Sequence, residues 1–124
     1  METAENRNQD LFSSIPKRIF RFRAWNNEKM DYGIDMKSAS VLIEDYPEIP
    51  LMQSTGMIDI FGTEIYEGDI VLPVKFRDVP NVVHFLSNGF YRVKRHGVKE
   101  YYNPLGNCQI KVIGNIFENS ELLK

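Results

Sequence analysis

The sequence predicts a mainly β fold: a small antiparallel barrel-like domain with an N-terminal hairpin and little helix. Several short segments alternate apolar and polar residues and are rich in aromatic and branched side chains, as half-buried strands are. Clusters of turn-forming residues, such as Ser87-Asn88-Gly89, separate these segments at short intervals. We find no sustained helical stripe of apolar residues, and a length of 124 residues suits a single domain.

The first ordered element is expected to be a β-hairpin. Side chains alternate over Lys17–Trp25, a polar cluster follows at Asn26–Lys29, and alternation resumes over residues 30–34. Residues 1–15 are mostly polar and are expected to form a flexible tail. The single β domain is therefore expected to span residues 16–124.

The segment after the hairpin is expected to be extended and then irregular. Val41 and Ile43 would share one face of a strand over residues 38–43. Pro47 and Pro50 disfavour regular helix around them, because proline lacks a backbone donor and restricts the residue before it. A sub-division of the domain is therefore expected near residues 44–52.

Two turns are expected in the middle of the chain. Asp59-Ile60-Phe61-Gly62 has Asp first and Gly last, as type I turns prefer. The step Glu67-Gly68-Asp69 is predicted to reverse the chain between two short strands. Gly68 would adopt a positive φ, and Asp69 would accept hydrogen bonds from nearby backbone amides. Both residues are therefore assigned a structural role in this turn.

The second half of the chain is predicted to contain further hairpins. An Asn-Gly pair at 88–89 joins Val82–Leu86 to a return strand, and a second turn leads into Val98–Tyr102. The last long strand is Cys108–Phe117, with Gly114 marking a bulge. Short strands separated by turns in this way are typical of a small barrel, SH3-like or related.

Charge and cysteine content narrow the class of protein. The formal net charge of -2 gives no global attraction to nucleic acid or to an anionic membrane. The single cysteine, Cys108, excludes an internal disulfide and suits a reducing cytosol. The first residues have neither a basic nor an apolar segment typical of a secretory signal, and no apolar run is long enough to span a membrane. We therefore expect no membrane association.

The residues that could carry chemistry do not form a recognisable constellation. Four acidic residues lack the alternating oxygen spacing of a calcium loop: Asp59, Glu64, Glu67 and Asp69. His84, His96 and Cys108 lack zinc-ligand spacing, and nothing in the sequence requires the thiol to pair in space with an imidazole for nucleophilic catalysis. We predict no catalytic residue, no cofactor and no metal ligand, and hence no enzyme. An enzyme of unrecognised type is the alternative that this pattern leaves open.

A basic and aromatic stretch provides the candidate nucleic-acid contacts, which are Tyr91, Arg92, Lys94, Arg95 and Lys99. Aromatic rings interleaved with cations on a small barrel can stack on bases and contact phosphates. The same pattern also arises on an ordinary solvated strand face, and nearby acids cancel the overall charge. A nucleic-acid-binding barrel is therefore an alternative function.

Three stretches of the chain are distinctive: FRFRAWNNEKM at Phe20–Met30, LMQSTGMIDIFGTEIYEGDIV at Leu51–Val71, and VIGNIFENSELL at Val112–Leu123. Together they resemble the YopX family of phage and prophage proteins. The resemblance implies a mainly β protein of phage or prophage origin, with no reaction or cofactor attached to the family. With the single cysteine, it leads us to expect a location in the cytoplasm of a bacterial host cell.

The chain departs from the family pattern at one turn. In the family, the turn after the Thr-Gly pair is usually polar, of the form Asp-Lys-Asn-Gly, but here Ile60 and Phe61 occupy its centre. Because exposed apolar residues at a turn are costly in water, we expect them to cover the core or to form an interaction tip. The leading hypothesis is a non-enzymatic binding or assembly module that forms a homo-oligomer or binds a protein partner.

Overall fold

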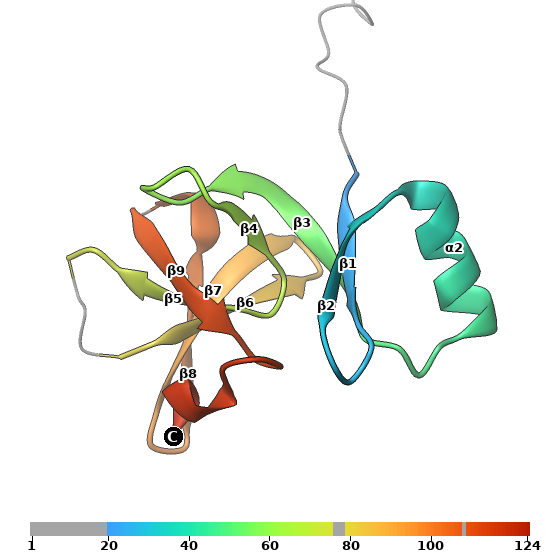
Figure 1. Cartoon of the computed structure of the whole chain (residues 1–124). Helices are drawn as coiled ribbons and strands as arrows, with labels where there is room; N and C mark the ends of the chain where they lie inside the picture. Colours follow the sequence, from blue (N-terminus) through green and yellow to red (C-terminus); the bar gives the residue numbers. More distant parts are fainter. Residues whose placement is uncertain (1–19, 76–78, 108) are drawn as a thin grey trace, which may run out of the picture.

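The structure is a computed structural model that describes residues 20–75, 79–107 and 109–124. In this part of the chain, nine strands form two antiparallel sheets, accompanied by one α-helix and two short 3-10 helices. Figure 1 shows the five-stranded sheet at one end of the molecule and the helix at the other. The predicted mainly β class is confirmed. Three parts of the sequence-based prediction lie outside the described residues: the flexible segment at 1–15, the start of the first strand, and Cys108.

The first sheet has the strand order β2-β1-β3-β4. Its strands are β1 (Phe22–Trp25), β2 (Met30–Ile34), β3 (Leu51–Ile58) and β4 (Glu64–Tyr66). The predicted N-terminal hairpin is confirmed, because Trp25 pairs with Met30 across a four-residue connection. The side-chain Oδ1 of Asn26 accepts hydrogen bonds from the amides of Glu28 and Lys29, which fixes this connection.

The second sheet has the strand order β8-β7-β6-β5-β9. Its strands are β5 (Asp69–Pro73), β6 (Asn81–Leu86), β7 (Gly89–His96), β8 (Lys99–Pro104) and β9 (Ile110–Asn115), and the 3-10 helices are η1 (Leu105–Asn107) and η2 (Ser120–Leu123). The predicted hairpin at Asn88-Gly89 is present, with Leu86 paired to Gly89. The predicted bulge is present too, because the register between β5 and β9 shifts by one residue next to Gly114.

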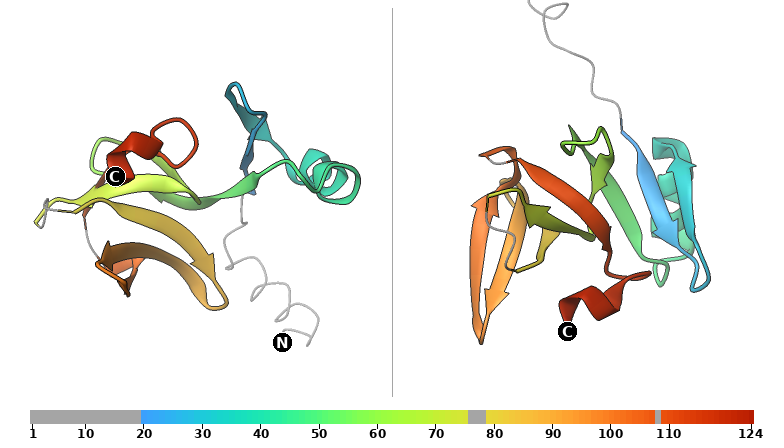
Figure 2. Two further views of the ribbon diagram at one scale, coloured as in Figure 1. Left: turned by 90° about the horizontal axis from the view of Figure 1, so that it is seen from below. Right: turned by 60° about the vertical axis from the view of Figure 1, so that its left-hand side comes forward.

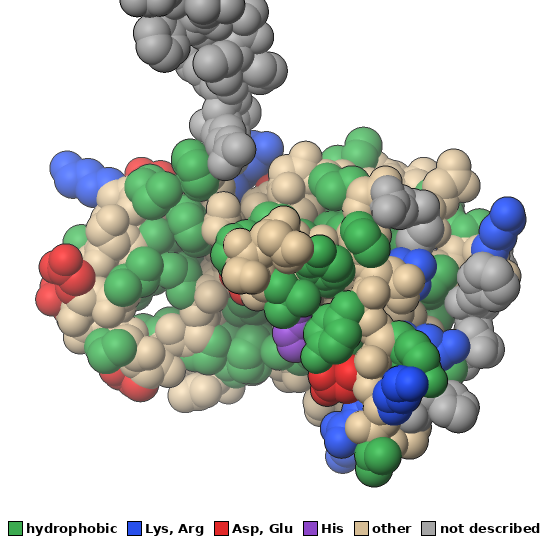
Figure 3. Space-filling model, turned by 180° about the vertical axis from the view of Figure 1, so that it is seen from behind, with side chains coloured by type: hydrophobic (Ala, Val, Ile, Leu, Met, Phe, Trp, Pro, Cys, Tyr) green, Lys and Arg blue, Asp and Glu red, His purple; other side chains and the backbone are tan. Residues whose placement is uncertain are grey.

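The expectation of a strand at 38–43 is wrong, because these residues lie in the helix α2 (Met36–Asp45). Asp35 caps the helix by accepting a hydrogen bond from the amide of Ser38 at 2.8 Å. Val41 and Ile43, whose alternation suggested a strand, are both exposed, whereas Ala39 is fully buried. Figure 3 shows hydrophobic side chains on the surface over this half of the molecule. The helix therefore buries a small residue and exposes larger ones. For this reason the pattern of apolar residues along the sequence does not identify it as a helix.

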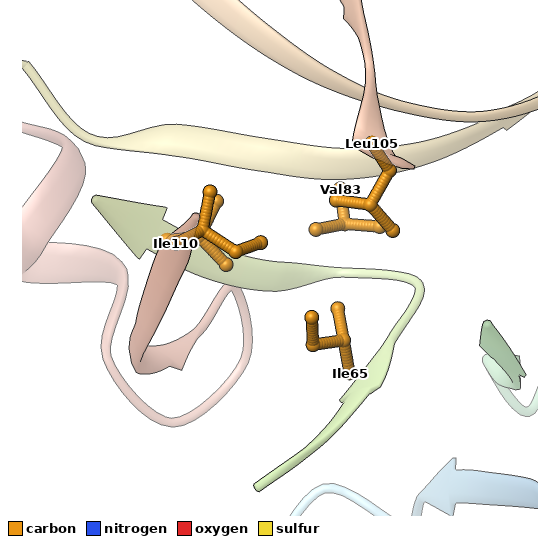
Figure 4. Packing of buried hydrophobic residues seen from close by; sticks show 5 residues of the cluster. Ile65, Val83, Leu105 and Ile110 are labelled. Carbon is orange, nitrogen blue, oxygen red and sulfur yellow. The ribbon is translucent and has the colours of Figure 1, made fainter. Parts of the chain in front are cut away.

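The hydrophobic core lies between β4 and the five-stranded sheet. Its buried residues come from β4, β5, β6, η1 and β9, and they are Ile65, Val71, Val83, Leu105 and Ile110. Figure 4 shows the side chains of Ile65, Val83, Leu105 and Ile110 pointing toward one another. Because each side chain comes from a different element, one core joins strands that are distant in the sequence.

The β3–β4 hairpin covers the five-stranded sheet, so the arrangement is barrel-like but not closed. The amide of Ile60 donates to the carbonyl of Ile110 at 3.1 Å, and the amide of Gly68 donates to the carbonyl of Val83 at 2.8 Å. These bonds connect the two ends of the hairpin to β9 and β6. Figure 2 shows β1, β2 and α2 to one side of this barrel-like part.

Candidate interaction site

The turn at Glu67-Gly68-Asp69 has the structural role that the sequence predicts. Gly68 has a φ of 82°, and a Cβ atom there would lie 3.2 Å from the Sδ atom of Met52. The Oδ2 atom of Asp69 accepts a hydrogen bond from the amide of Tyr66 at 2.8 Å. Glu67 binds the neighbouring strand, since its Oε1 atom accepts from the amide of Gln53 at 2.9 Å. The acids at this turn therefore hold backbone amides.

Asp69 also forms a buried ion pair that sequence reasoning missed. The Nη2 atom of Arg23 lies 2.8 Å from its Oδ1 atom, and both side chains are almost fully buried. The same nitrogen donates to the carbonyl of Glu67 at 2.9 Å. Burial raises the pKa of Asp69, opposed by the charge of Arg23 and the amide of Tyr66. Nothing local marks Arg23 as buried, because an exposed arginine, Arg21, lies two residues earlier and has the same phase in the strand pattern.

The ion pair lines a cavity of about 440 Å³ between the two sheets. The ring of Tyr66 lies under the guanidinium of Arg23, with 4.8 Å between the ring centroid and Cζ. Glu64, also at this cavity, has its Oε2 atom 3.3 Å from the Nε atom of Arg21. Each acid here faces an arginine, so these two pairs give a ligand no local excess of charge to recognise.

The other candidate chemical groups remain dispersed. His84 is exposed on β6 and lines a surface groove with Arg95 and Glu100. Cys108 and the side chain of His96 lie outside the described parts of the structure. Within the described residues, no group of three or more His, Cys, Asp or Glu side chains is placed to hold a metal ion.

The five candidate nucleic-acid contacts divide between the two faces of the β7–β8 hairpin. Alternation along β7 places Arg92 and Lys94 on one face and Tyr91 and Arg95 on the other. Lys94 pairs with Tyr101, so Lys99, two residues along β8, shares its face. Arg92 is partly buried, and its Nη1 atom lies 3.5 Å from the Oδ1 atom of Asn81. The set therefore does not form one continuous patch.

The turn between β3 and β4 holds its two apolar residues in a fixed position. The Oδ1 atom of Asp59 accepts hydrogen bonds from the amides of Phe61 and Thr63, each at 2.8 Å. Its Oδ2 atom accepts from the amide of Val112 at 3.0 Å, which ties the turn to β9. The amide of Gly62 donates to the carbonyl of Asp59 at 3.0 Å. The predicted turn, with Asp first and Gly last, is therefore present.

Hydrogen bonding also affects the acidity of Asp59. Burial alone would raise the pKa of this carboxyl, but backbone amides from Val112, Thr63 and Phe61 outweigh that effect. The net pKa therefore lies below its ordinary value, because these donors stabilise the charged form. The carboxylate is thus an anchor for the turn at neutral pH.

We name the exposed apolar residues at this turn the tip surface, which consists of Met57, Ile58, Ile60 and Phe61. Phe61 is 70% exposed and Ile60 is 45% exposed, so the hypothesis that they cover the core is wrong. A groove of about 200 Å³ lies beside them, and its other walls are Leu72, Pro73, Val74 and Lys111. The Nζ atom of Lys111 lies 5.6 Å from the ring centroid of Phe61. This arrangement is an apolar groove with a cationic wall.

A second exposed apolar surface lies on α2 and just after it. Its larger members are Met36, Val41, Ile43 and Tyr46. Unlike the tip surface, these side chains lie on a helix that buries only Ala39. The tip surface combines exposure, a groove and a rigid turn, so we take it as the candidate interaction site.

The fold and this site define a small, mainly β protein with an exposed apolar surface on a hydrogen-bonded turn. The model of the family described as YopX protein matches residues 33–124. The chain belongs to the YopX family, as its resemblance predicted. No curated protein matches the chain in sequence. Within the described residues, no helix has the length and apolar character needed to cross a membrane.

Among solved structures, the chain is similar to one described as the crystal structure of protein EF1440 from Enterococcus faecalis. The sequence identity is 22% and the TM-score is 0.49. The similarity covers 87% of this chain and 100% of that chain.

Proposed function

We propose that this YopX-family protein is a non-enzymatic assembly module of phage or prophage origin, and that it associates with copies of itself through the tip surface in the host cytoplasm. The observation that carries the proposal is the exposure of Ile60 and Phe61 on a turn that Asp59 holds rigidly. The family resemblance supports the proposed phage origin, and the single cysteine, Cys108, is consistent with the proposed cytoplasmic location.

The energetic argument concerns how the tip surface is presented. Fully burying a side chain such as Ile or Phe contributes about 1.5–3 kcal/mol, so Ile60 and Phe61 together favour association. The three hydrogen bonds to the Asp59 side chain fix the turn before binding, which lowers the entropic cost of association. The non-enzymatic character is supported by the acids, whose oxygens hold backbone amides or face arginines.

Light scattering over a range of micromolar concentrations tests this function. Wild-type protein should show a molar mass that rises above that of one chain. The double variant Ile60→Lys/Phe61→Asn gives the polar turn form typical of the family and keeps Asp59 and Gly62, so it should fold and remain monomeric. Val98→Ser is the matched control, because Val98 is 96% exposed at a different turn and should not affect association. A wild-type protein that stays monomeric throughout would refute the proposal.

Nucleic-acid binding is a second candidate, favoured by one contact on the exposed edge strand. The Nζ atom of Lys99 lies 5.5 Å from the ring centroid of Tyr101, and such cation–aromatic pairs suit stacking on unpaired bases. The protein should then retard single-stranded DNA in a gel at low salt, and Lys99→Ala should weaken this binding. The same substitution should reduce the slope of log binding constant against log salt concentration by about 1. Lys29→Ala, on the distant β1–β2 connection, is the control. An absence of any shift at low salt would remove this candidate.

A further inference from the structure

We infer that self-association is head-to-tail, with the C-terminal turn of one copy seated in the tip groove of the next. We name this turn the tail, which consists of Glu118–Leu123, and the groove beside the tip surface the tip groove. The inference rests on the proposed self-association and adds to it a second surface on this same chain. It depends on the shape, the chemistry and the positions of the two surfaces.

The tail presents apolar side chains beside acids. Leu122 and Leu123 line a groove beside β6 and β7 of their own chain but remain 36% and 45% exposed, and Glu118 and Glu121 are exposed near them. The turn that leads into the tail is preformed, because the Oδ1 atom of Asn115 accepts hydrogen bonds from the amides of Phe117 and Glu118. A preformed segment loses little conformational entropy on docking.

The tip groove has the complementary properties. Its volume of about 200 Å³ exceeds the ~150 Å³ of an engineered apolar cavity that holds benzene, so it can accept a leucine side chain. Its walls are largely apolar, and Lys111 supplies an exposed cation at its edge. Lys75 is also exposed and follows the groove residue Val74 in the chain. Leucines flanked by glutamates therefore match the groove in both hydrophobicity and charge.

The positions of the two surfaces require that the occupant comes from another copy. Figure 1 places the β3–β4 turn at the top of the molecule and the C-terminal end at the bottom, and the right-hand view of Figure 2 agrees. A chain therefore cannot place its tail in its own tip groove. A contact between different patches is heterologous, so repeating it produces a ring or a filament.

The apolar surface on α2 is the competing site of contact. This helix also carries the exposed Lys37, so its surface too combines apolar side chains with a cation. Ile43→Asp serves as the variant for this surface, because Ile43 is 61% exposed and tolerates a charge without burial. Loss of association in Ile43→Asp would assign the contact to the helix and overturn the head-to-tail arrangement.

Mixing two variants provides the decisive experiment. The tip variant is Ile60→Lys/Phe61→Asn, and the tail variant is Leu122→Ser/Leu123→Ser. Each alone should be monomeric in light scattering, because each lacks one of the two required surfaces. Their equimolar mixture should form a 1:1 dimer, since the first supplies an intact tail and the second an intact tip groove. Hydrogen-exchange or circular-dichroism spectra matching wild type would show that both variants are folded.

A charge exchange tests the polar part of the contact. Lys111→Glu should weaken association about tenfold, and Glu121→Lys should weaken it similarly, whereas a mixture of the two variants should recover part of the affinity. If wild type associates but the tip and tail variants fail to pair, the head-to-tail contact is refuted while self-assembly stands. If wild type never associates, the proposed function itself fails.

Discussion

The ion pair between Arg23 and Asp69 shows how single residues join the two sheets. Arg23 lies in β1 and Asp69 begins β5, and the guanidinium also binds the carbonyl of Glu67. Desolvation of both charges is costly, so the pair stabilises the fold only while both partners are present. The ion pair therefore gives Asp69, which directly follows Gly68, a structural role.

Asp69→Asn should therefore destabilise the protein by about 3–5 kcal/mol, because it leaves the Arg23 charge buried and unpaired. Chemical denaturation monitored by fluorescence would measure the loss. Glu64→Gln is the control, since the pair between Glu64 and Arg21 is partly exposed and should contribute about 0–1 kcal/mol. Equal effects of the two substitutions would contradict the assigned role of the buried pair.

The lowered pKa of Asp59 predicts how the free energy of unfolding depends on pH. Its pKa is lower in the folded state than in the unfolded state, where it is about 3.9. The unfolded state therefore binds the proton more tightly, so the stabilisation is present above that value and is lost as the pH falls through the folded pKa. Asp59→Asn should show a shallower decrease in unfolding free energy between about pH 5 and about pH 3 than wild type. Parallel pH profiles would exclude this contribution.

At the scale of an element, the last strand and the tail depend on Gly114. A Cβ atom at this position would lie 2.6 Å from the Cγ and Oδ1 atoms of Asn119 and 2.7 Å from its Cβ atom. The Oδ1 atom of Asn119 accepts a hydrogen bond from the amide of Asn115 at 3.1 Å, so the side chain cannot move without breaking this bond. The glycine therefore allows the chain after β9 to fold back closely.

Gly114→Ala should lower the unfolding free energy by about 1–3 kcal/mol, because overpacking forces the tail away from β9. Thermal denaturation would measure this, and Asn119→Gly in the same chain should restore part of the loss by creating space. If Gly114→Ala unfolds at the same temperature as wild type, the close approach is not a stability determinant.

The helix and the turns differ in how far sequence predicts them. The turns at Gly62, Gly68 and Gly89 are local, because each depends on residues within a few positions, and all three were predicted. Helix α2 was missed because its buried face is a single alanine, Ala39, while the alternation of Val41 and Ile43 has no partner strand. A short apolar run is ambiguous when its burial depends on tertiary structure.

The candidate interaction site was also only partly predictable, because some of its features are local in sequence and others depend on tertiary structure. Ile60 and Phe61 were identified because the YopX resemblance implies polar residues at these two turn positions. The groove beside them was not predictable, since Leu72, Pro73 and Lys111 come from β5 and β9. Likewise, the pairing of Arg23 with Asp69 joins positions that are far apart in the chain. Contacts of this kind arise from topology rather than from local pattern.

At the scale of the whole molecule, the barrel-like part and the helix differ in burial. Ile70 and Val71 are fully buried on β5, an internal strand of the five-stranded sheet with β6 on one side and β9 on the other. Helix α2 buries only Ala39. Because local stability follows buried apolar contact, the two parts should open independently.

Native-state hydrogen exchange would test this difference. Amides of α2 should exchange through local opening, with a free energy well below that of global unfolding, whereas the amides of Ile70 and Val71 should exchange only when the whole protein unfolds. Ala39→Gly should lower the protection of α2 further, by about 1 kcal/mol from helix propensity, and leave the protection of β5 nearly unchanged. Equal protection of α2 and β5, shifting together in this variant, would show instead that the helix and the barrel-like part form one cooperative unit.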